Sequence, residues 1–576
     1  MRRWSFRHAY SPARGIFATC RHADIVRVRR GPFVLVMMLG IAALCIGAAA
    51  ARGSRQAAGT VYYLSSSGSD SASGTSPANA WRTINRLNSQ ILKPGDTVLF
   101  QGGATFSGEV YVSPSENGTS AQPITFDSYG TGRATISGGT GSSAFVYDSG
   151  GIVIQDLVLK GSGASTNTSD GLGFYNDLAG NVKRSFVRIT NVSVSGFGHY
   201  GISIGGWNGS SGFQDVAVTY SDLHDNGRGG LVTYGPAFQP GSPAYANANV
   251  YVGHIAAYDN LGDPKYTANS GNGVVLGSVA TGTIERSVSH DNGALCHASA
   301  CGAGIWAYDS TGITIQYNES YDNRTGSTTD GDGFDLDQNT SNSWLQYNYS
   351  HGNDGSGYLL YTGQSNSSWS GNTVRYNISE SDGRKNGYAS IFGGGRISNS
   401  SVYNNTVYLV PAASGTPSAV RFLSVSSSVT VRNNILHVVG GLPMVMAPSV
   451  PSSSLAFQQN DYFSPSGQFK VTWGSTTYTT PASWRTATGQ EMLAGVAKGV
   501  TTDPRLVSPG GGGTIGNADN LASLTAYRLQ TTSPLRDIGL NLQSLFGVIM
   551  GGHDYYGMPA PVGLGPEVGA AELAVG

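Results

Sequence analysis

Four aspartates in one short segment are the residues best suited to chemistry, and they are Asp330, Asp332, Asp335 and Asp337. They lie in residues 329–337, whereas charged residues make up only 12% of the chain. If this segment is a strand, alternation places Phe334 and Leu336 on one face and the last two aspartates on the other, about 7 Å apart. The first two aspartates precede the strand and can fold over the same patch. Four carboxylates this close repel one another, so the segment predicts a bound cation or raised pKa values.

Aromatic side chains are expected beside the last two aspartates if similar strands stack on either side. The aromatic residues in question are Trp306, Tyr308, Tyr361 and, further along the same column, Tyr234. Trp306 would lie beside Asp335. Tyr308 and Tyr361 would lie on either side of Asp337. Because aromatic rings stack on the apolar faces of sugars, this pattern predicts a substrate-binding surface for a polysaccharide.

Further acid–base candidates follow the acidic segment. Asp354 and Asp382 fall in the turns of the next two repeats, and Arg384 and Lys385 form the most basic spot within reach. Lys385 and Arg384 are therefore the candidate bases, with Lys265 a distant third, and Asp354 is a candidate second carboxylate. A lysine acts as a base near neutral pH only where its pKa is depressed.

A repeat of about thirty residues must position these groups. An aromatic residue or His, then Asp or Gly, then Asn recurs 30 to 34 residues apart, ending at Asn226, Asn260, Asn292, Asn323 and Asn353. A second series, 29 or 30 residues apart, runs through Asn318, Asn348 and Asn377. Alternating stretches such as 201–204 and 312–316 lie between these markers and indicate short strands. His224, His290 and His351 share the aromatic position of the repeat and are expected to be turn residues.

A strand-and-turn unit of this kind cannot bury its apolar side alone and must stack on copies of itself. The sequence therefore predicts an all-β solenoid, a single-stranded parallel β-helix of roughly ten coils. Its asparagines are expected to form ladders inside the turns, where they satisfy backbone groups from coil to coil.

Both ends of the repeat region differ from its middle. The repeats are assigned to residues 151–466, with an N-terminal cap and first coils at 61–150 and an irregular C-terminal cap at 467–576. The N-terminal cap is expected to hold a short amphipathic helix, because apolar residues fall at helical spacing at Trp81, Ile84, Leu87 and Ile91.

The start of the chain resembles an export signal. Eight arginines fall within the first 30 residues, and an apolar run to Ala51 ends in four alanines. Residues 1–51 are therefore interpreted as a leader or an uncleaved anchor, and 52–60 as a linker. Either reading predicts a secreted or cell-surface protein, with contact to a membrane only through this segment.

Composition limits the partners. The net charge of −1 gives no support for nucleic-acid binding and provides no global field for an anionic polymer. Outside the leader the only cysteines are Cys296 and Cys301, which in an exported protein predict a local disulfide. A metal site there is disfavoured, because only His297 offers a third soft ligand nearby.

Several motifs carry a resemblance to a known superfamily. Near the start are Tyr-Tyr-Leu-Ser at 62–65, Trp-Arg-Thr-Ile at 81–84 and Pro-Gly-Asp-Thr-Val at 94–98. Near the end are Ser-Pro-Leu-Arg-Asp-Ile-Gly at 533–539 and Val-Gly-Ala-Ala-Glu at 568–572. Together with the repeats, these resemble the exported bacterial members of the pectate-lyase-like superfamily over roughly residues 60 to 572. The resemblance implies a right-handed parallel β-helix but not a particular reaction.

The resemblance suggests calcium-assisted β-elimination as the leading chemistry. Calcium-dependent pectate lyases use clustered aspartates to hold Ca²⁺, and the four aspartates look like such a cluster of hard oxygen ligands. Ca²⁺ binds the uronate carboxylate of the substrate and acidifies the neighbouring C–H. Lys385 or Arg384 would then remove that proton, and the substrate would be an acidic extracellular polysaccharide cleaved by a monomer.

Three alternatives remain open. Residues 332–335 resemble the Asp-Gly-Phe-Asp of polygalacturonases, so Asp332 or Asp335 could work with Asp354 in hydrolysis, although that family's Gly-His-Gly is absent. Residues 333–335 resemble the start of the mannuronan C5-epimerase motif, but its Pro and His are missing. The protein could also be a non-catalytic glycan-binding solenoid, because aspartates in turns often only accept backbone hydrogen bonds.

Overall fold

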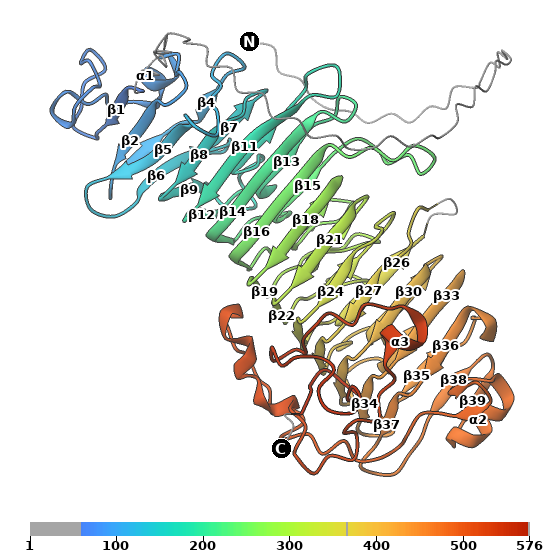
Figure 1. The fold of residues 1–576 in the computed structure, drawn as a ribbon. Helices are drawn as coiled ribbons and strands as arrows, with labels where there is room; N and C mark the ends of the chain where they lie inside the picture. The colour runs from blue at the N-terminus through green and yellow to red at the C-terminus, as the bar shows by residue number, and fades with distance from the viewer. Residues whose placement is uncertain (1–58, 364–366, 574–576) are drawn as a thin grey trace, which may run out of the picture. The chain divides into compact units, whose positions relative to one another are not determined.

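The computed structural model describes residues 59–363 and 367–573, and these form a parallel β-helix. Almost every strand pairs in parallel with the strands one coil before and one coil after it (Figure 1). The chain makes about 13 turns. The predicted all-β solenoid is therefore confirmed. The number of coils was underestimated at roughly ten.

One face of the solenoid is a sheet of 14 strands within the described residues, 13 of them parallel. Its members are β4 (Val110–Val112), β7 (Ala144–Tyr147), β10 (Leu172–Tyr175), β13 (Tyr200–Gly205), β15 (Gly229–Tyr234), β17 (Asn272–Gly277), β20 (Ala303–Tyr308), β23 (Asp332–Leu336), β26 (Tyr358–Thr362), β29 (Ala389–Gly395), β32 (Ser418–Phe422), β35 (Val445–Ala447), β38 (Val471–Trp473) and the antiparallel β39 (Thr476–Tyr478). The acidic segment supplies β23.

The other two faces are rows of strands that the long strands β14 and β16 join into one sheet. The first row contains β1 (Val61–Leu64), β2 (Thr97–Gln101), β5 (Ile124–Tyr129), β8 (Ile152–Gln155), β11 (Lys183–Thr190), β14 (Gly212–His224), β16 (Asn247–Tyr258), β18 (Val279–Glu285), β21 (Thr311–Gln316), β24 (Trp344–Gln346), β27 (Thr373–Arg375), β30 (Ser398–Tyr403), β33 (Ser427–Arg432) and β36 (Leu455–Gln458). The second row shares β14 and β16 and adds β3 (Thr105–Ser107), β6 (Ala134–Gly139), β9 (Leu157–Gly161), β12 (Ser193–Ser195), β19 (Val288–His290), β22 (Glu319–Tyr321), β25 (Tyr349–His351), β28 (Ile378–Glu380), β31 (Thr406–Leu409), β34 (Ile435–Val438) and β37 (Asp461–Phe463).

Inward side chains of all three faces build one continuous core. In the 14-stranded sheet, Ile305, Phe334, Tyr358 and Ile391 are partners in register on successive strands, and each is fully buried. Burying one such side chain contributes about 1.5–3 kcal/mol. The buried hydroxyl of Tyr358 donates to backbone carbonyl oxygens, which removes the cost of placing it in the core.

The predicted asparagine ladders are confirmed. In the second series, the amide of Asn318 donates to Asn348 Oδ1 at 3.0 Å, and each member donates onward in the same way through Asn377, Asn405, Asn434 and Asn460. The first series continues in the same direction from Asn226 to Asn353. Both ladders end on a carboxylate, the first on Asp382 and the second on Glu491.

The prediction that the repeat histidines are turn residues is wrong, because His224, His290 and His351 are the last residues of β14, β19 and β25. The rings of His224, Tyr258, His290, Tyr321 and His351 stack face to face on successive coils, with centroids 4.7 to 5.2 Å apart. With interplanar angles of 1° to 8°, these rings form a continuous column along the ends of the strands.

The N-terminal cap contains the short helix α1 (Ile84–Asn88), which the sequence predicted, and a 3-10 turn at Pro77–Asn79. Trp81, Ile84 and Leu87 are buried, as the spacing indicated. The prediction for Ile91 is wrong, because its side chain is 61% exposed. The helix ends at Asn88, so the helical periodicity does not reach this residue.

The C-terminal segment passes back along the turns of the later coils (Figure 1). It contains α2 (Pro481–Thr488), α3 (Leu542–Phe546), the hairpin β40 (Met492–Leu493) and β41 (Val496–Ala497), and 3-10 turns at Ala518–Ser523 and Thr525–Tyr527, with another turn at Ser452–Ser454 before it. The buried Glu319 carboxylate accepts hydrogen bonds from the N–H groups of Ile515 and Gly516, at 2.7 and 2.6 Å. Such contacts attach the segment to the solenoid.

The predicted leader, residues 1–51, and most of the linker lie outside the described residues. Among the residues that are described, no helix has the length and apolar character needed to cross a membrane.

Candidate functional site

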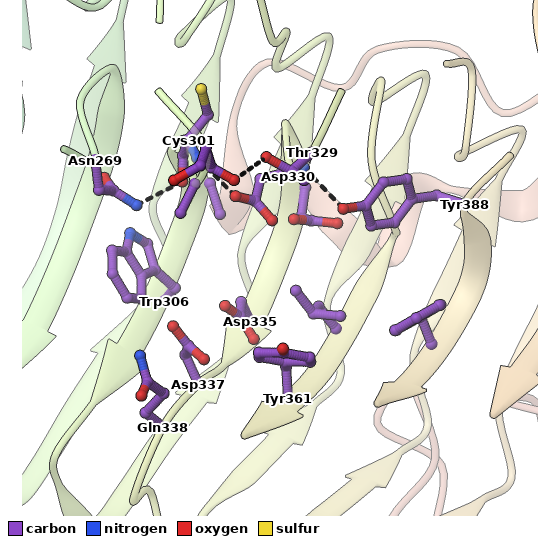
Figure 2. A pocket seen from close by; sticks show the side chains of 16 residues that line it. Asn269, Cys301, Trp306, Thr329, Asp330, Asp335, Asp337, Gln338, Tyr361 and Tyr388 are labelled. Carbon is purple, nitrogen blue, oxygen red and sulfur yellow. Dashed lines mark hydrogen bonds between the residues drawn. The ribbon is translucent and has the colours of Figure 1, made fainter. Parts of the chain in front are cut away.

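A pocket of about 290 Å³ opens on the outward face of the 14-stranded sheet, centred on β23. It is lined by all four predicted aspartates, and Trp306 and Tyr361 lie beside them (Figure 2). The structure therefore brings together the acidic cluster and two of the four predicted aromatic residues. The other two, Tyr308 and Tyr234, lie on the same face, and Tyr308 lines an adjoining hollow.

The strand register places these groups as alternation predicted. Trp306 pairs with Asp335 across β20 and β23, and Leu359 pairs with Asp335 from β26. Asp337 follows β23 in the column that holds Tyr308 and Tyr361. Asp335 is 5% exposed, so its carboxylate lies between two large apolar side chains.

Glycines on neighbouring coils keep the space beside Asp337 open. A methyl group at Gly277 would lie 2.3 Å from Cζ of Tyr308, so the Tyr308 ring rests on β17, away from Asp337. A methyl group at Gly394 would lie 2.9 Å from Cδ2 of Tyr361, which leans the opposite way toward β29. The two tyrosines therefore diverge, and Asp337 stands at the base of the gap.

Asp330 reaches the pocket from the turn before β23. Asp330 and Gly331 both have positive φ, 60° and 83°, a backbone conformation that Asp and Gly tolerate best. The N–H of Cys301 donates to the Asp330 carboxylate at 2.6 Å, and the N–H of Asp330 donates to the Tyr388 hydroxyl at 2.9 Å. This turn holds Asp330 at the edge of the pocket nearest Cys301 and Tyr388 (Figure 2).

Burial is the main cause of raised pKa values throughout the cluster. It raises the pKa of Asp330 to about 6, although the hydrogen bond from Cys301 opposes the rise. Burial and the nearby carboxylates of Asp330 and Asp309 raise the pKa of Asp337 to about 7. The pKa values of Asp332 and Asp335 rise well above the usual range, because both are buried and face other carboxylates. Raised pKa values, one of the two predicted outcomes, are thus confirmed.

Three carboxylate oxygens in the cluster lack a hydrogen-bond partner although they are buried: Asp332 Oδ2, Asp335 Oδ1 and Asp337 Oδ1. Asp332 is the most enclosed, and its other oxygen accepts the N–H of Ser356. A buried oxygen without a donor is costly unless the group carries a proton or meets a ligand. Asp330 and Asp337 are half-buried and can touch a bound molecule.

The predicted bases do not line this pocket. The Lys385 ammonium donates to the carbonyl of Thr325 at 2.5 Å, and the Arg384 guanidinium donates to the carbonyl of Pro411 at 2.8 Å. The backbone N–H groups of both residues bond to the turn at Asn353 and Asp354, which holds them at the edge of the solenoid.

Two other candidates also lie elsewhere. Asp354 accepts hydrogen bonds from the Thr325 N–H and from Arg324, and it does not line the acidic pocket. Lys265 lines a separate cleft with His199.

Several lining residues were not anticipated from the sequence. They include Asn269, Gln338, Tyr388 and Phe392. Phe392 pairs with Leu359 and could have been found by extending the column by one coil. Tyr388 and Asn269 lie in turns of irregular length, where no periodic signal exists.

A metal site is not assigned to the aspartates. In the part of the chain that the structure describes, no group of three or more His, Cys, Asp or Glu side chains is arranged to hold a metal ion. The calcium prediction therefore gains no geometric support from the cluster.

Cys296 and Cys301 are placed at disulfide geometry, with Cα atoms 5.8 Å apart. Cys301 also lines the pocket, and its N–H binds Asp330. The predicted disulfide would therefore brace the loop that holds one of the aspartates.

Fold and site together define a β-helix protein with an acidic, aromatic-flanked pocket on its 14-stranded sheet. No protein-family model matches the chain. The lacto-N-biosidase of Bifidobacterium longum subsp. longum is 24% identical over 446 residues, which cover 61% of this chain and 27% of that protein. The chain thus spans about a quarter of the length of this curated relative.

Solved structures with a similar chain course include a GH136 lacto-N-biosidase from Eubacterium ramulus, at 17% identity and a TM-score of 0.41, covering 64% of this chain and 67% of that one. Pectate lyase Pel9A has 16% identity and a TM-score of 0.42, covering 90% and 97% of the two chains.

Proposed function

We propose that this protein is an exported glycoside hydrolase that cleaves an uncharged glycan, with Asp337 as proton donor and Asp330 as its ionised partner. The observation that carries the proposal is the lining of the pocket. Four carboxylates line it, and none of its lining residues is Lys, Arg or His. The curated relative bears the name of a glycosidase, which supports the same class of reaction.

The charge of the pocket argues against a uronate substrate. An anionic sugar would meet several carboxylates without a compensating cation among the lining residues. β-Elimination also requires a base to remove a proton from carbon, and Lys385 and Arg384 are bonded to backbone carbonyl groups and do not line the pocket. Hydrolysis needs only two carboxyl groups, one protonated and one ionised.

The environments of the two aspartates assign their roles. Asp330 has the lower pKa of the two, about 6, and receives a hydrogen bond from Cys301 that stabilises the ionised form. Asp337 has a pKa of about 7 and an oxygen without a partner, so near neutral pH it can hold a proton and release it. Acid–base hydrolysis needs one carboxyl group protonated and the other ionised, and burial raises the pKa of both aspartates toward neutral pH, where that state is populated.

The reaction follows from these roles. Asp337 donates its proton to the glycosidic oxygen as the bond from that oxygen to the anomeric carbon breaks. Asp330 either attacks that carbon or removes a proton from the water that does. Water ends as a hydroxyl on the anomeric carbon. After attack by Asp330, the ionised Asp337 takes the proton of the water that releases the sugar; after proton removal by Asp330, that proton leaves to solvent and Asp337 regains one from solvent. The product anomer distinguishes the two routes.

The flanking rings would bind the sugar. The Trp306 indole is fixed by a hydrogen bond from its Nε1 to Asn272 Oδ1 at 2.8 Å, and Tyr361 is 40% exposed. Fixed aromatic faces beside two carboxyl groups orient a sugar ring at little entropic cost.

The test is a screen of the purified full chain on neutral and acidic polysaccharides, with Ca²⁺ and with a chelator. The assay follows reducing ends together with ultraviolet absorbance from a new double bond. We expect reducing ends from a neutral glycan without absorbance, and a loss of at least about 100-fold in Asp330→Asn and Asp337→Asn. The exposed turn variant Asp291→Asn is the control and should retain activity. Calcium-dependent absorbance on a polyuronide would replace hydrolysis with elimination.

A further inference from the structure

A second group of aromatic side chains lies on the same sheet as the pocket, toward the N-terminus. Its members are Tyr111 on β4, Phe145 and Tyr147 on β7, Tyr175 on β10, and Trp207 in the loop after β13. Tyr111 is 38% exposed and Trp207 is 57% exposed. We call these five residues the aromatic track. None of them lines the acidic pocket.

The rings of the track lie in contact from coil to coil. Tyr111 stacks on Phe145 with centroids 6.4 Å apart, and Tyr147 stacks on Tyr175 at 5.9 Å with an interplanar angle of 7°. Trp207 packs on Tyr234 at 5.0 Å. The rings therefore provide a run of apolar faces along the sheet, broken only at the small residues of β13.

Register connects the track to the acidic coil. One outward column runs from Tyr147 through Tyr175, Gly205, Tyr234 and Gly277 to Tyr308, and Asp337 is next in that column. A methyl group at Gly205 would lie 2.8 Å from the Tyr234 ring, so this ring, like that of Tyr308, lies flat on the neighbouring coil. Tyr234 and Tyr308 therefore each lie over a glycine of the preceding coil.

A hollow of about 270 Å³ bridges the remaining gap. It shares Trp306, Asp337 and Gln338 with the acidic pocket and extends over Tyr308 to Tyr200 and Val232. Tyr234 packs against the same buried cluster as Val232 and Trp306, and Trp207 packs on Tyr234.

The chemistry of the track matches that of the pocket. Burial and then the nearby Asp148 and Asp177 carboxylates raise the pKa of Tyr147, so negative charge lies close to the rings. The adjoining hollow is lined by no Lys, Arg or His side chain. A polyanion is therefore disfavoured along the whole path.

We propose that the aromatic track binds an extended, uncharged glycan chain whose cleavage point lies at Asp337. The inference rests on the proposed function and specifies its substrate as a polymer or long oligosaccharide. Seven coil steps separate β4 from β23, a length of about 34 Å. A disaccharide held in the pocket could not reach these rings.

The test compares substrates of increasing length. A panel of galactan, xylan, arabinan and glucomannan identifies the polymer that is cleaved or bound, and its oligosaccharides of graded length are then used. We expect kcat/KM to increase with length. Trp207→Ala and Tyr147→Ala should each lower kcat/KM about three- to tenfold on the longest chains, with a loss that shrinks as chains shorten. Tyr220→Ala is the matched control, because Tyr220 is 60% exposed on β14 of the other sheet.

Binding to the Asp337→Asn variant separates this inference from the proposed function. Length-dependent binding that requires Trp207, without hydrolysis by the parent protein, would support the track and refute the hydrolase. Hydrolysis with no dependence on length or on Trp207 would refute the track and leave the hydrolase standing. Equal effects of Trp207→Ala and Tyr220→Ala would also overturn the inference.

Discussion

Hydrolysis by the two aspartates requires Asp330 to be ionised while Asp337 keeps its proton. With pKa values of about 6 and about 7, this state is most abundant near pH 6.5. At pH 5 protonation of Asp330 makes it about sixfold rarer, and at pH 8 ionisation of Asp337 does the same. We therefore expect a narrow bell-shaped profile of kcat/KM with limbs near pH 6 and pH 7.

One substitution outside the pocket should shift only one limb of the pH profile of kcat/KM. The carboxylate of Asp309 contributes to the raised pKa of Asp337 but does not line the pocket. Asp309→Asn removes this negative charge and should shift the alkaline limb to lower pH. The acid limb, which reports Asp330, should stay in place.

The assay is the initial rate of reducing-end release from the identified glycan between pH 4.5 and 9, with preincubation controls for inactivation. A flat profile from pH 5 to pH 8 would contradict the assignment, as would a lone acid limb near pH 4. Movement of the acid limb in Asp309→Asn would exchange the roles of the two aspartates.

Three further predictions concern the scaffold. Gly277→Ala should push the Tyr308 ring toward the gap beside Asp337 and lower kcat/KM roughly 10- to 100-fold, with a nearly unchanged melting temperature. A variant as active as the unsubstituted protein would contradict the placement of the Tyr308 ring against Gly277. Asn348→Ala removes a fully buried ladder member and should lower the free energy of unfolding by about 3–5 kcal/mol in denaturant titration, whereas less than about 1 kcal/mol would argue against ladder support. Burial and Glu567 raise the pKa of Glu572 to about 9 from 4.5, so stability should fall as pH rises between these values. Glu572→Gln should flatten this slope in melts across the same range, and an unaltered slope would assign it to other groups.

The periodicity of the sequence was enough to predict the fold and half of the residues of the site. Alternation placed Asp335 and Asp337 outward, and constant coil spacing placed Trp306 and Tyr361 beside them, because a parallel sheet has one register per coil. The same spacing underlies the ladders. These features are repeated, so they are visible in a single sequence.

The errors in the predicted site concern residues in turns. Lys385 is only a few coils from the pocket in sequence, but its ammonium binds the carbonyl of Thr325 and does not line the pocket. Tyr388 reaches Asp330 from a turn whose length no repeat dictates. The burial of each aspartate determines its pKa, and burial could not be predicted from the sequence. Asp330 and Asp337 are half-buried and Asp332 is enclosed, although the three residues have similar sequence contexts.

Each asparagine ladder has a direction. Every amide donates its N–H toward the C-terminal end and accepts on its oxygen, so the side-chain dipoles add as peptide dipoles do along a helix. The positive end of each row falls at its last member, where Asp382 or Glu491 accepts the final hydrogen bond. An acidic side chain at that place ends the row with a group that needs no further acceptor. The side-chain dipoles of each ladder therefore align along the solenoid axis, and a carboxyl group lies at the positive end of the row.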